Sequence, residues 1–291
     1  MTTPAQWVAG ARPRTLGAAV APVLVGTAVA YAEVDDVIWW RAAAALVVSL
    51  ALQVGVNYAN DYSDGVRGTD DVRAGPLRLT ASKLATPTAV RTAAALAFGV
   101  AAVVGLTLAV IVDLRLLLVG VAAIAAAALY TGGPRPYGYS GFGELAVLVF
   151  FGLVATTGST YVQIERVPGV AWWSAVAVGL LACAILVANN IRDVAGDRAA
   201  GKRTLAVRLG ARPARILYAA CLAIAFGIVF VIALGSSAWA LLALLALPLA
   251  VRPVRLVLTR TDPLSLVSAL VGTARLELVF SMFLALGLVL S

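Results

Sequence analysis

The sequence contains no histidine, only two cysteines and few charged residues. Of its 291 residues 12% are charged, whereas soluble proteins carry roughly a quarter. Without histidine, the protein has no imidazole to bind a metal or to act as a general acid or base. Cys183 and Cys221 lie inside apolar runs, where cysteine packs as a small hydrophobic side chain. We therefore assign them neither a disulfide nor a metal.

The apolar content indicates a polytopic membrane protein. Hydrophobic residues make up 62% of the chain, and they form runs near the roughly 20 residues that a helix needs to cross a bilayer. The expected spans are 15–31, 37–59, 88–112, 114–130, 142–162, 171–189, 214–234, 238–256 and 264–290. The eighth is the weakest, because Pro248, Arg252 and Pro253 crowd its end, and Pro22 and Pro248 suggest kinks. We expect an all-α membrane protein of about nine transmembrane helices, one bundle over residues 1–291. Residues 1–14 are polar and basic and show no signal peptide.

The distribution of basic residues predicts the orientation. Most Lys and Arg fall in the loops on the side of the N-terminus, and the opposite loops keep only Arg41, Arg115 and Arg166. Cytoplasmic loops carry such an excess, so the N-terminus is expected in the cytoplasm and, with nine spans, the C-terminus outside. The net charge of +8 therefore reports topology, and we expect no nucleic-acid partner.

Two polar stretches, 57–64 and 189–197, stand at the cytoplasmic ends of apolar runs. Their acids and amides recur at spacings of three and four, which places them on shared helix faces. These residues are Asn57, Asn60, Asp61 and Asp64 in the first polar stretch and Asn189, Asp193 and Asp197 in the second. Two facing sets of oxygen ligands suit a hard divalent cation, most naturally Mg²⁺ bridging to phosphate.

Basic residues follow each polar stretch within a loop's reach. They are Arg67 and Arg78 after the first and Lys202 and Arg203 after the second, and Arg135 lies in a third cytoplasmic loop. Carboxylates that hold a metal and cations that contact phosphate oxygens are the mixture that a metal-bound diphosphate requires. The pair Asp70 and Asp71 is either loop charge in solvent or an aid to the metal.

Other interpretations of these charges remain open. One such cluster alone could be interfacial residues that set topology. An ion-coupled transporter could use them as coupling sites, although transporters place such groups near the bilayer midplane. A non-catalytic scaffold gives no reason for two oxygen clusters.

Several motifs resemble those of the UbiA superfamily of intramembrane aromatic prenyltransferases. The Asn-Asp-x-x-Asp start at Asn60 and the later Asp-x-x-x-Asp at Asp193 resemble its two aspartate motifs. Further segments resemble its 1,4-dihydroxy-2-naphthoate polyprenyltransferases of menaquinone synthesis, namely Ala11-Arg12-Pro13-Arg14-Thr15-Leu16, Gly75-Pro76-Leu77-Arg78, Tyr130-Thr131-Gly132-Gly133-Pro134 and Asn189-Asn190-Ile191-Arg192-Asp193. The likeness covers nearly the whole chain. Gly68 stands where many members carry a further aspartate.

The resemblance implies a UbiA-like helix bundle with cytoplasmic cap loops in the cell membrane, its active site facing the cytoplasm. It implies transfer of a polyprenyl group from polyprenyl diphosphate to 1,4-dihydroxy-2-naphthoate, with loss of diphosphate and CO2. Other acceptors, such as 4-hydroxybenzoate, stay as alternatives. The long donor tail is expected in an apolar slot between helices that opens sideways to the lipid bilayer.

The resemblance also implies roles for individual residues. The residues that would hold Mg²⁺ and, through it, the diphosphate are Asn57, Asn60, Asp61, Asp64, Asp193 and Asp197, with the four aspartates as catalytic carboxylates. Lys202 is the favoured direct diphosphate contact, beside Arg67, Arg78, Arg135 and Arg203. Tyr130, Tyr137 and Tyr139 could shield an allylic cation with their ring faces. Acceptor contacts are expected among Arg12, Arg14, Asn189, Arg192, Tyr137 and Tyr139.

Arg275 and Glu277 are charged residues inside the last apolar run. Charge within a span is costly, so it suggests a function. Residues two apart do not face each other on a helix, and each therefore needs a partner elsewhere. A polar lock between helices and a substrate contact are both open.

Overall fold

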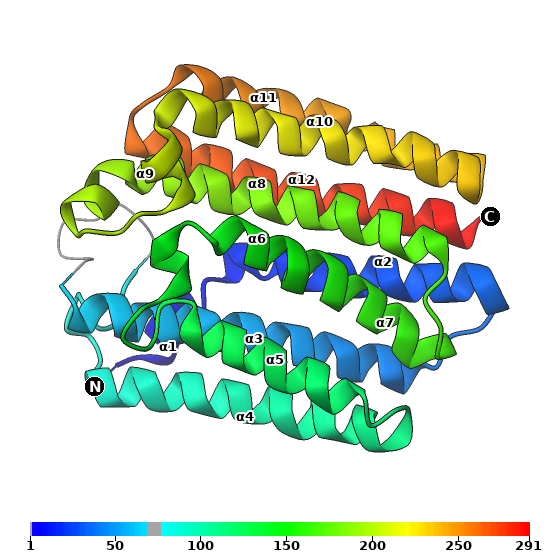
Figure 1. The fold of residues 1–291 in the computed structure, drawn as a ribbon, viewed down its shortest axis with the longest axis horizontal. Helices are drawn as coiled ribbons and strands as arrows, with labels where there is room; N and C mark the ends of the chain where they lie inside the picture. The colour runs from blue at the N-terminus through cyan, green and yellow to red at the C-terminus, as the bar shows by residue number, and fades with distance from the viewer. Residues whose placement is uncertain (1, 69–76) are drawn as a thin grey trace.

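A computed structural model describes residues 2–68 and 77–291, and that part of the chain is built of helices and contains no strand (Figure 1). In chain order the elements are α1 Pro4–Gly10, η1 Pro13–Thr15, α2 Gly17–Val34, α3 Trp39–Val66, α4 Pro87–Ile111, α5 Leu116–Leu129, η2 Tyr137–Ser140, α6 Gly143–Val147, η3 Leu148–Val154, α7 Ala155–Ile164, α8 Gly169–Ala199, α9 Leu205–Leu209, α10 Ala211–Gly235, η4 Ala238–Ala246, α11 Leu247–Thr259 and α12 Pro263–Val289. η3 is a π-helix, and η1, η2 and η4 are 3-10 helices. The expected pair Asp70 and Asp71 lies outside the described residues.

Eight of the described helical segments are long and apolar enough to cross a bilayer. A ninth apolar helix, α5, has only 14 residues, fewer than the roughly 17–25 of a typical span. The all-α membrane bundle predicted from the sequence is confirmed. The eighth predicted span, expected to be the weakest, is formed by η4 and α11 together and has 22 residues. The span that falls short in length is the fourth, which corresponds to α5.

Pro248 in the eighth span, where the sequence suggests a kink, lies where the helical type changes. Pro248 lies in the first turn of α11, directly after the 3-10 segment η4. Proline suits a helix's first turn, because its missing N–H has no partner there in any case. Pro248 therefore marks the change from a 3-10 to an α-helical path within one span.

The core is centred on α8, α10, α12 and α2. These helices carry most of the buried apolar side chains, many of them alanine, and Figure 1 shows them running side by side along the long axis. Small residues let backbones approach closely: a Cβ on Gly26 of α2 would lie 2.2 Å from the Thr156 carbonyl oxygen of α7. This tight half of the bundle provides a rigid wall for the cavity described below.

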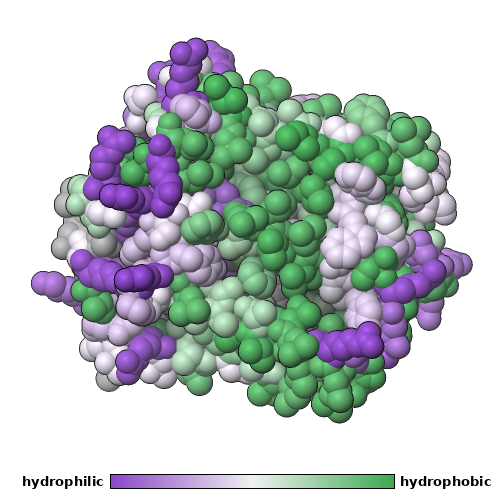
Figure 2. All heavy atoms as spheres, in the orientation of Figure 1, coloured by the Kyte–Doolittle hydropathy of each residue, from purple (hydrophilic) through white to green (hydrophobic). Residues whose placement is uncertain are grey.

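The surface matches a protein that spans a bilayer. Figure 2 shows an apolar band across the middle and hydrophilic side chains gathered toward the two ends. Exposed tryptophans Trp39, Trp172 and Trp239 lie in the first turns of helices at the end opposite the two polar stretches. Tryptophan is enriched at membrane interfaces, so these rings mark one boundary of the bilayer.

Candidate active site

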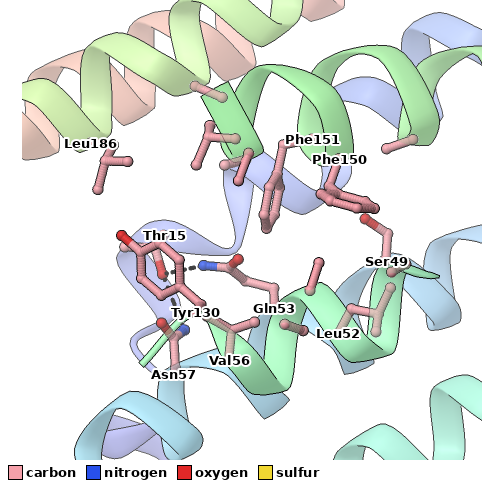
Figure 3. Close-up of a pocket in the computed structure, with 18 of the residues that line it drawn as sticks. Thr15, Ser49, Leu52, Gln53, Val56, Asn57, Tyr130, Phe150, Phe151 and Leu186 are labelled. Carbon is pink, nitrogen blue, oxygen red and sulfur yellow. Dashed lines mark hydrogen bonds between the residues drawn. The ribbon is translucent and has the colours of Figure 1, made fainter. Parts of the chain in front are cut away.

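A cavity of about 360 Å³ lies between α2, α3, α5, α8 and the span that contains η3. Its wall is apolar along most of its length and becomes polar at one end. The polar lining residues include Arg12, Asn57, Asn60, Asp64, Arg78, Asn189, Asn190, Asp197 and Lys202. Figure 3 shows this polar end, where Asn57, Gln53 and Tyr130 surround Thr15, next to the apolar wall. An amphipathic molecule with one charged end fits such a cavity.

The two polar stretches meet at Lys202. Its ammonium nitrogen lies 2.9 Å from Oδ1 of Asp64, on α3, and 3.9 Å from Oδ1 of Asp197, on α8. All three side chains are buried. A buried charge is costly unless it is paired, and Lys202 pairs with one carboxylate from each stretch. The structure thus brings together Asp64, Asp197 and Lys202 from the predicted set.

The asparagines of the first polar stretch are fixed by neighbouring segments. Asn57 donates its Nδ2 to the Ala11 carbonyl at 2.9 Å and to the Thr15 hydroxyl at 3.3 Å. Asn60 accepts a hydrogen bond from the Thr131 hydroxyl at 2.7 Å. With its nitrogen engaged, Asn57 keeps its carbonyl oxygen for a ligand, whereas the oxygen of Asn60 already has a donor.

Asp61 faces a loop of its own chain. Its two carboxylate oxygens accept the backbone N–H groups of Leu79 and Thr80 at 2.7 and 2.9 Å, and the side chain is 1% exposed. These bonds hold the segment that carries Arg78, which is buried and lines the cavity. Asp61 itself is not among the lining residues, so within this arrangement it positions a cation and does not line the cavity.

In the second polar stretch, both carboxylate oxygens of Asp193 likewise accept hydrogen bonds from within the protein. Arg192 donates to both of its carboxylate oxygens, at 2.8 and 2.7 Å, and to Oδ1 of Asn189 at 2.8 Å. The Arg192 side chain is buried and does not line the cavity. Its contact with Asn189, which does line it, connects this cluster to the cavity wall.

Besides Arg192, four of the predicted arginines do not line the cavity. Arg67 donates to the carbonyls of Thr131 and Gly133, the latter at 2.7 Å, and thereby ties the end of α3 to the loop after α5. Arg14, Arg135 and Arg203 are exposed. Of the arginines predicted to contact the diphosphate or the acceptor, Arg12 and Arg78 are the ones that line the cavity.

The three predicted tyrosines all line the cavity. Tyr130 and Tyr137 pack edge to face with ring centroids 5.5 Å apart, and Tyr139 donates a short hydrogen bond to Asp64. The Lys202 nitrogen lies 4.5 Å from the centroid of the Tyr139 ring. Burial raises the pKa of Tyr137 to about 12, and burial followed by the Asp64 carboxylate raises the pKa of Tyr139. Both phenols are therefore neutral donors at physiological pH.

Sequence reasoning missed Glu144 and Asn190. The Asn190 amide lines the cavity and donates its Nδ2 to Oε1 of the buried Glu144 at 2.9 Å. This bond fixes which way the amide faces. A signal was present, because Glu144 is an acid at the start of an apolar run, where charge is costly.

Glu277 and Arg275, in contrast, do not line the cavity. Glu277 is fully buried in the core face of α12, while Arg275 is exposed. Residues two apart point in different directions on a helix, as expected.

The polar end also fits a magnesium ion. Within residues 2–68 and 77–291, no three acidic side chains converge on a point that could hold a metal. Mg²⁺ is commonly bound by one or two carboxylates together with substrate phosphates, however, and Asp64, Asp197 and the Asn57 oxygen are hard ligands of the right kind. Lys202 between them supplies the cation that a diphosphate would also contact.

An all-helical membrane bundle with paired carboxylates and a lysine at the polar end of an apolar cavity has the features of an intramembrane enzyme. Residues 19–287 match the UbiA prenyltransferase family. The chain therefore belongs to that family, as the motifs predicted.

Curated relatives agree with this assignment. The 1,4-dihydroxy-2-naphthoate octaprenyltransferase of Mycobacterium tuberculosis is 54% identical over 258 residues, covering 88% of each chain. The protein of the same name from Escherichia coli is 38% identical and covers 98% of this chain and 95% of its own. A solved UbiA homologue of Archaeoglobus fulgidus, bound to GPP and Mg²⁺, shares the fold with a TM-score of 0.66 at 13% identity, covering 98% of this chain and 100% of its own.

Proposed function

We propose that this protein transfers a polyprenyl group from a polyprenyl diphosphate to 1,4-dihydroxy-2-naphthoate, with release of diphosphate and CO2. The observation that carries the proposal is Lys202 between Asp64 and Asp197 at the polar end of an apolar cavity. Relatives that share up to 54% of their residues with this chain carry the name of that activity. The product is a prenylated naphthoquinol of menaquinone synthesis.

Binding divides between the two parts of the cavity. Lys202 and Arg78 line the polar end and would contact the diphosphate, and Asp64, Asp197 and Asn57 would hold the Mg²⁺ that accompanies it. Bound Mg²⁺ neutralises charge that develops on the departing diphosphate. The isoprenoid tail occupies the apolar part between α3, α5 and η3.

The reaction then balances without an external acid or base in the transfer step. Cleavage of the allylic C–O bond leaves its electron pair on the diphosphate and a carbocation at C1 of the chain. The naphthoate ring attacks through the carbon that bears its carboxylate, and that carboxylate leaves as CO2, so its bonding electrons restore the aromatic ring. Tyr130, Tyr137 and Tyr139 line the cavity where their ring faces can stabilise the cation.

The acceptor carboxylate requires a cation near the rings. Arg12 lines the cavity at its polar end and is the arginine that we assign to this contact. The polar end lies on the side where basic loops gather, so we place the active site at the cytoplasmic face of the cell membrane. The acceptor then arrives from the cytoplasm and the donor from the bilayer.

The test is an assay of the purified protein in detergent with Mg²⁺, a polyprenyl diphosphate and either 1,4-dihydroxy-2-naphthoate or 4-hydroxybenzoate, followed by the product mass. We expect a prenylated naphthoquinol that lacks the CO2 group, lost on adding EDTA and in Asp64→Ala. Arg203→Ala, which changes an exposed residue beside Lys202, is the matched control. Product from 4-hydroxybenzoate alone would keep the chemistry and replace the acceptor. Absence of product from either acceptor would overturn the proposal.

A further inference from the structure

The span between Gly143 and Ile164 changes its helical type where it meets the cavity. It starts as the α-helix α6, continues as a π-helix over Leu148–Val154 and ends as the α-helix α7. π-helical turns are rare, occur mostly as single-turn insertions in α-helices and are frequent at functional sites. This segment therefore calls for a functional explanation.

The residues of this span that line the cavity follow a step of four. One row consists of Ala146, Phe150, Val154, Gly158 and Val162, and the residues directly after its first four members line the cavity as well. An α-helix has 3.6 residues per turn, so a step of four advances about 40° too far each time and drifts by about 160° over sixteen residues. An uninterrupted α-helix would turn the second half of this row away from the cavity.

The π-helical segment corrects that drift. Its wider turn takes up one extra residue, and one residue of an α-helix corresponds to about 100° of rotation. The remaining drift, about 60°, keeps both halves of the row on the cavity side. The neighbours Phe150 and Phe151 belong to this π-helical segment and both line the cavity, and Figure 3 shows the two rings entering it from the same helix.

The wide turn is held in place by close packing against α8. A Cβ on Gly152 would lie 2.7 Å from the Cα of Gly179 and 2.8 Å from the Ala175 carbonyl oxygen. Only a glycine pair permits that approach, so the backbone of η3 is fixed against the rigid half of the bundle. The packing therefore holds the backbone that carries Phe150 and Phe151 in place.

The rings face α3 across the cavity. Figure 3 shows Phe150 and Phe151 opposite Ser49 and Leu52, with Gln53, Val56 and Asn57 following toward the polar end. Along this span Phe150 and Phe151 lie between Ala146 and Val162, so a chain that runs from the polar end to Val162 passes the level of both rings.

We propose that Phe150 and Phe151, set side by side by the π-helical turn, are the residues that select the isoprenoid chain of the donor. The inference rests on the proposed function, which supplies a donor with an isoprenoid tail. The rings contact the isoprene units behind the allylic carbon. When one of the two rings is removed from the protein, a short isoprenoid chain cannot fill the space that the ring leaves. A longer chain can fold its later units into that space.

A labelling experiment tests the contact independently of the acceptor. A farnesyl diphosphate analogue with a diazirine on its second isoprene unit is bound to the intact protein with Mg²⁺, irradiated and located by peptide mass spectrometry. We expect labels on Phe150 and Phe151 and none on Val149 or Leu153. Labels elsewhere in the cavity would overturn the inference and leave the proposed function standing. If an excess of farnesyl diphosphate without the diazirine did not reduce the labelling, the result would count against both the inference and the proposed function.

A kinetic experiment tests the selection. We compare kcat/KM for geranyl diphosphate and for a donor of eight isoprene units in wild type, Phe150→Ala and Phe151→Ala. Removing a ring is expected to raise the long-to-short ratio roughly tenfold, the scale of discrimination that a pocket side chain provides. Phe230→Ala, which removes an exposed ring on α10, should leave the ratio unchanged. A ratio within about twofold of wild type in both cavity variants would overturn the inference.

Discussion

The ammonium group of Lys202 lies 2.9 Å from the carboxylate of Asp64, a residue 138 positions earlier in the chain. Asp197 approaches the same ammonium group to 3.9 Å. Two buried carboxylates of like charge thus share one ammonium group. In the proposed complex with Mg²⁺ and a diphosphate, Lys202 would gain a further anionic partner and the carboxylates would gain a further cation.

Lys202→Met tests this balance. Lys202 belongs to a buried ion pair, and removing one member of such a pair typically costs about 3–5 kcal/mol. We expect the variant to unfold at a lower temperature than wild type in EDTA and to regain part of the loss in MgCl2. Thermal unfolding with and without Mg²⁺ measures this, and Arg203→Met is the control. An unfolding temperature that is the same with and without Mg²⁺ would contradict the placement of the metal at Asp64 and Asp197.

Asp61 and Asp64 belong to one motif, but we expect their substitutions to impair different properties of the protein. Asp61→Asn replaces one acceptor oxygen by a donor, so one of the N–H groups of Leu79 and Thr80 loses its partner. Leaving a buried donor without a partner costs about 1–3 kcal/mol. We expect lower stability and, because Arg78 moves with the loop, a higher KM for the donor.

Asp64→Asn serves as the comparison. It changes a cavity carboxylate, so the concentration of Mg²⁺ needed for half-maximal rate should rise about tenfold or more, as expected for the loss of a charged ligand. Equal shifts of the Mg²⁺ requirement in both variants would show that Asp61 contacts the metal as well.

Tyr139 gives a pH prediction. Burial and the nearby Asp64 raise the pKa of Tyr139 in the folded protein above its unfolded value of about 10. A group with a raised pKa contributes stability that is complete below the unfolded pKa and is lost as pH rises through the folded one. Tyr139→Phe cannot ionise, so it should lose less stability than wild type between about pH 9 and pH 11. Chemical denaturation at these two pH values provides the measurement, and identical losses would show that Tyr139 is not held neutral by its surroundings.

Glu144 is predicted to act through Asn190. Glu144→Gln keeps a carbonyl oxygen that can accept the Asn190 N–H, whereas Glu144→Leu removes the acceptor. We expect kcat/KM close to wild type in the first variant and a loss of about tenfold in the second, equivalent to about 1.4 kcal/mol. The profile of rate against pH separates the alternatives. If Glu144 exchanged a proton with substrate, the Gln variant would be as impaired as the Leu variant.

The sequence alone determined the fold class and the pair of polar stretches, and it predicts the orientation. Apolar runs of spanning length leave helices as the structure that satisfies every backbone group in lipid. Spacings of three and four are local properties of a helix, so the spacing by itself identifies Asp61 with Asp64 and Asp193 with Asp197 as clusters. Segment lengths were less secure: the fourth span was expected over 114–130, whereas α5 covers Leu116–Leu129, because Leu114 and Arg115 form a turn before the helix and Tyr130 lies in a turn after it.

Only the tertiary structure decided which members of those clusters face the cavity. Asp61 and Asp64 are three residues apart, yet one accepts the backbone N–H groups of Leu79 and Thr80 while the other meets Lys202. The choice depends on contacts between segments far apart in the chain. The π-helical turn was equally hidden, since the apolar sequence of residues 148–154 suits an α-helix as well. It is the close approach of Gly152 and Gly179 that fixes the wider turn, and with it the position of the two aromatic rings.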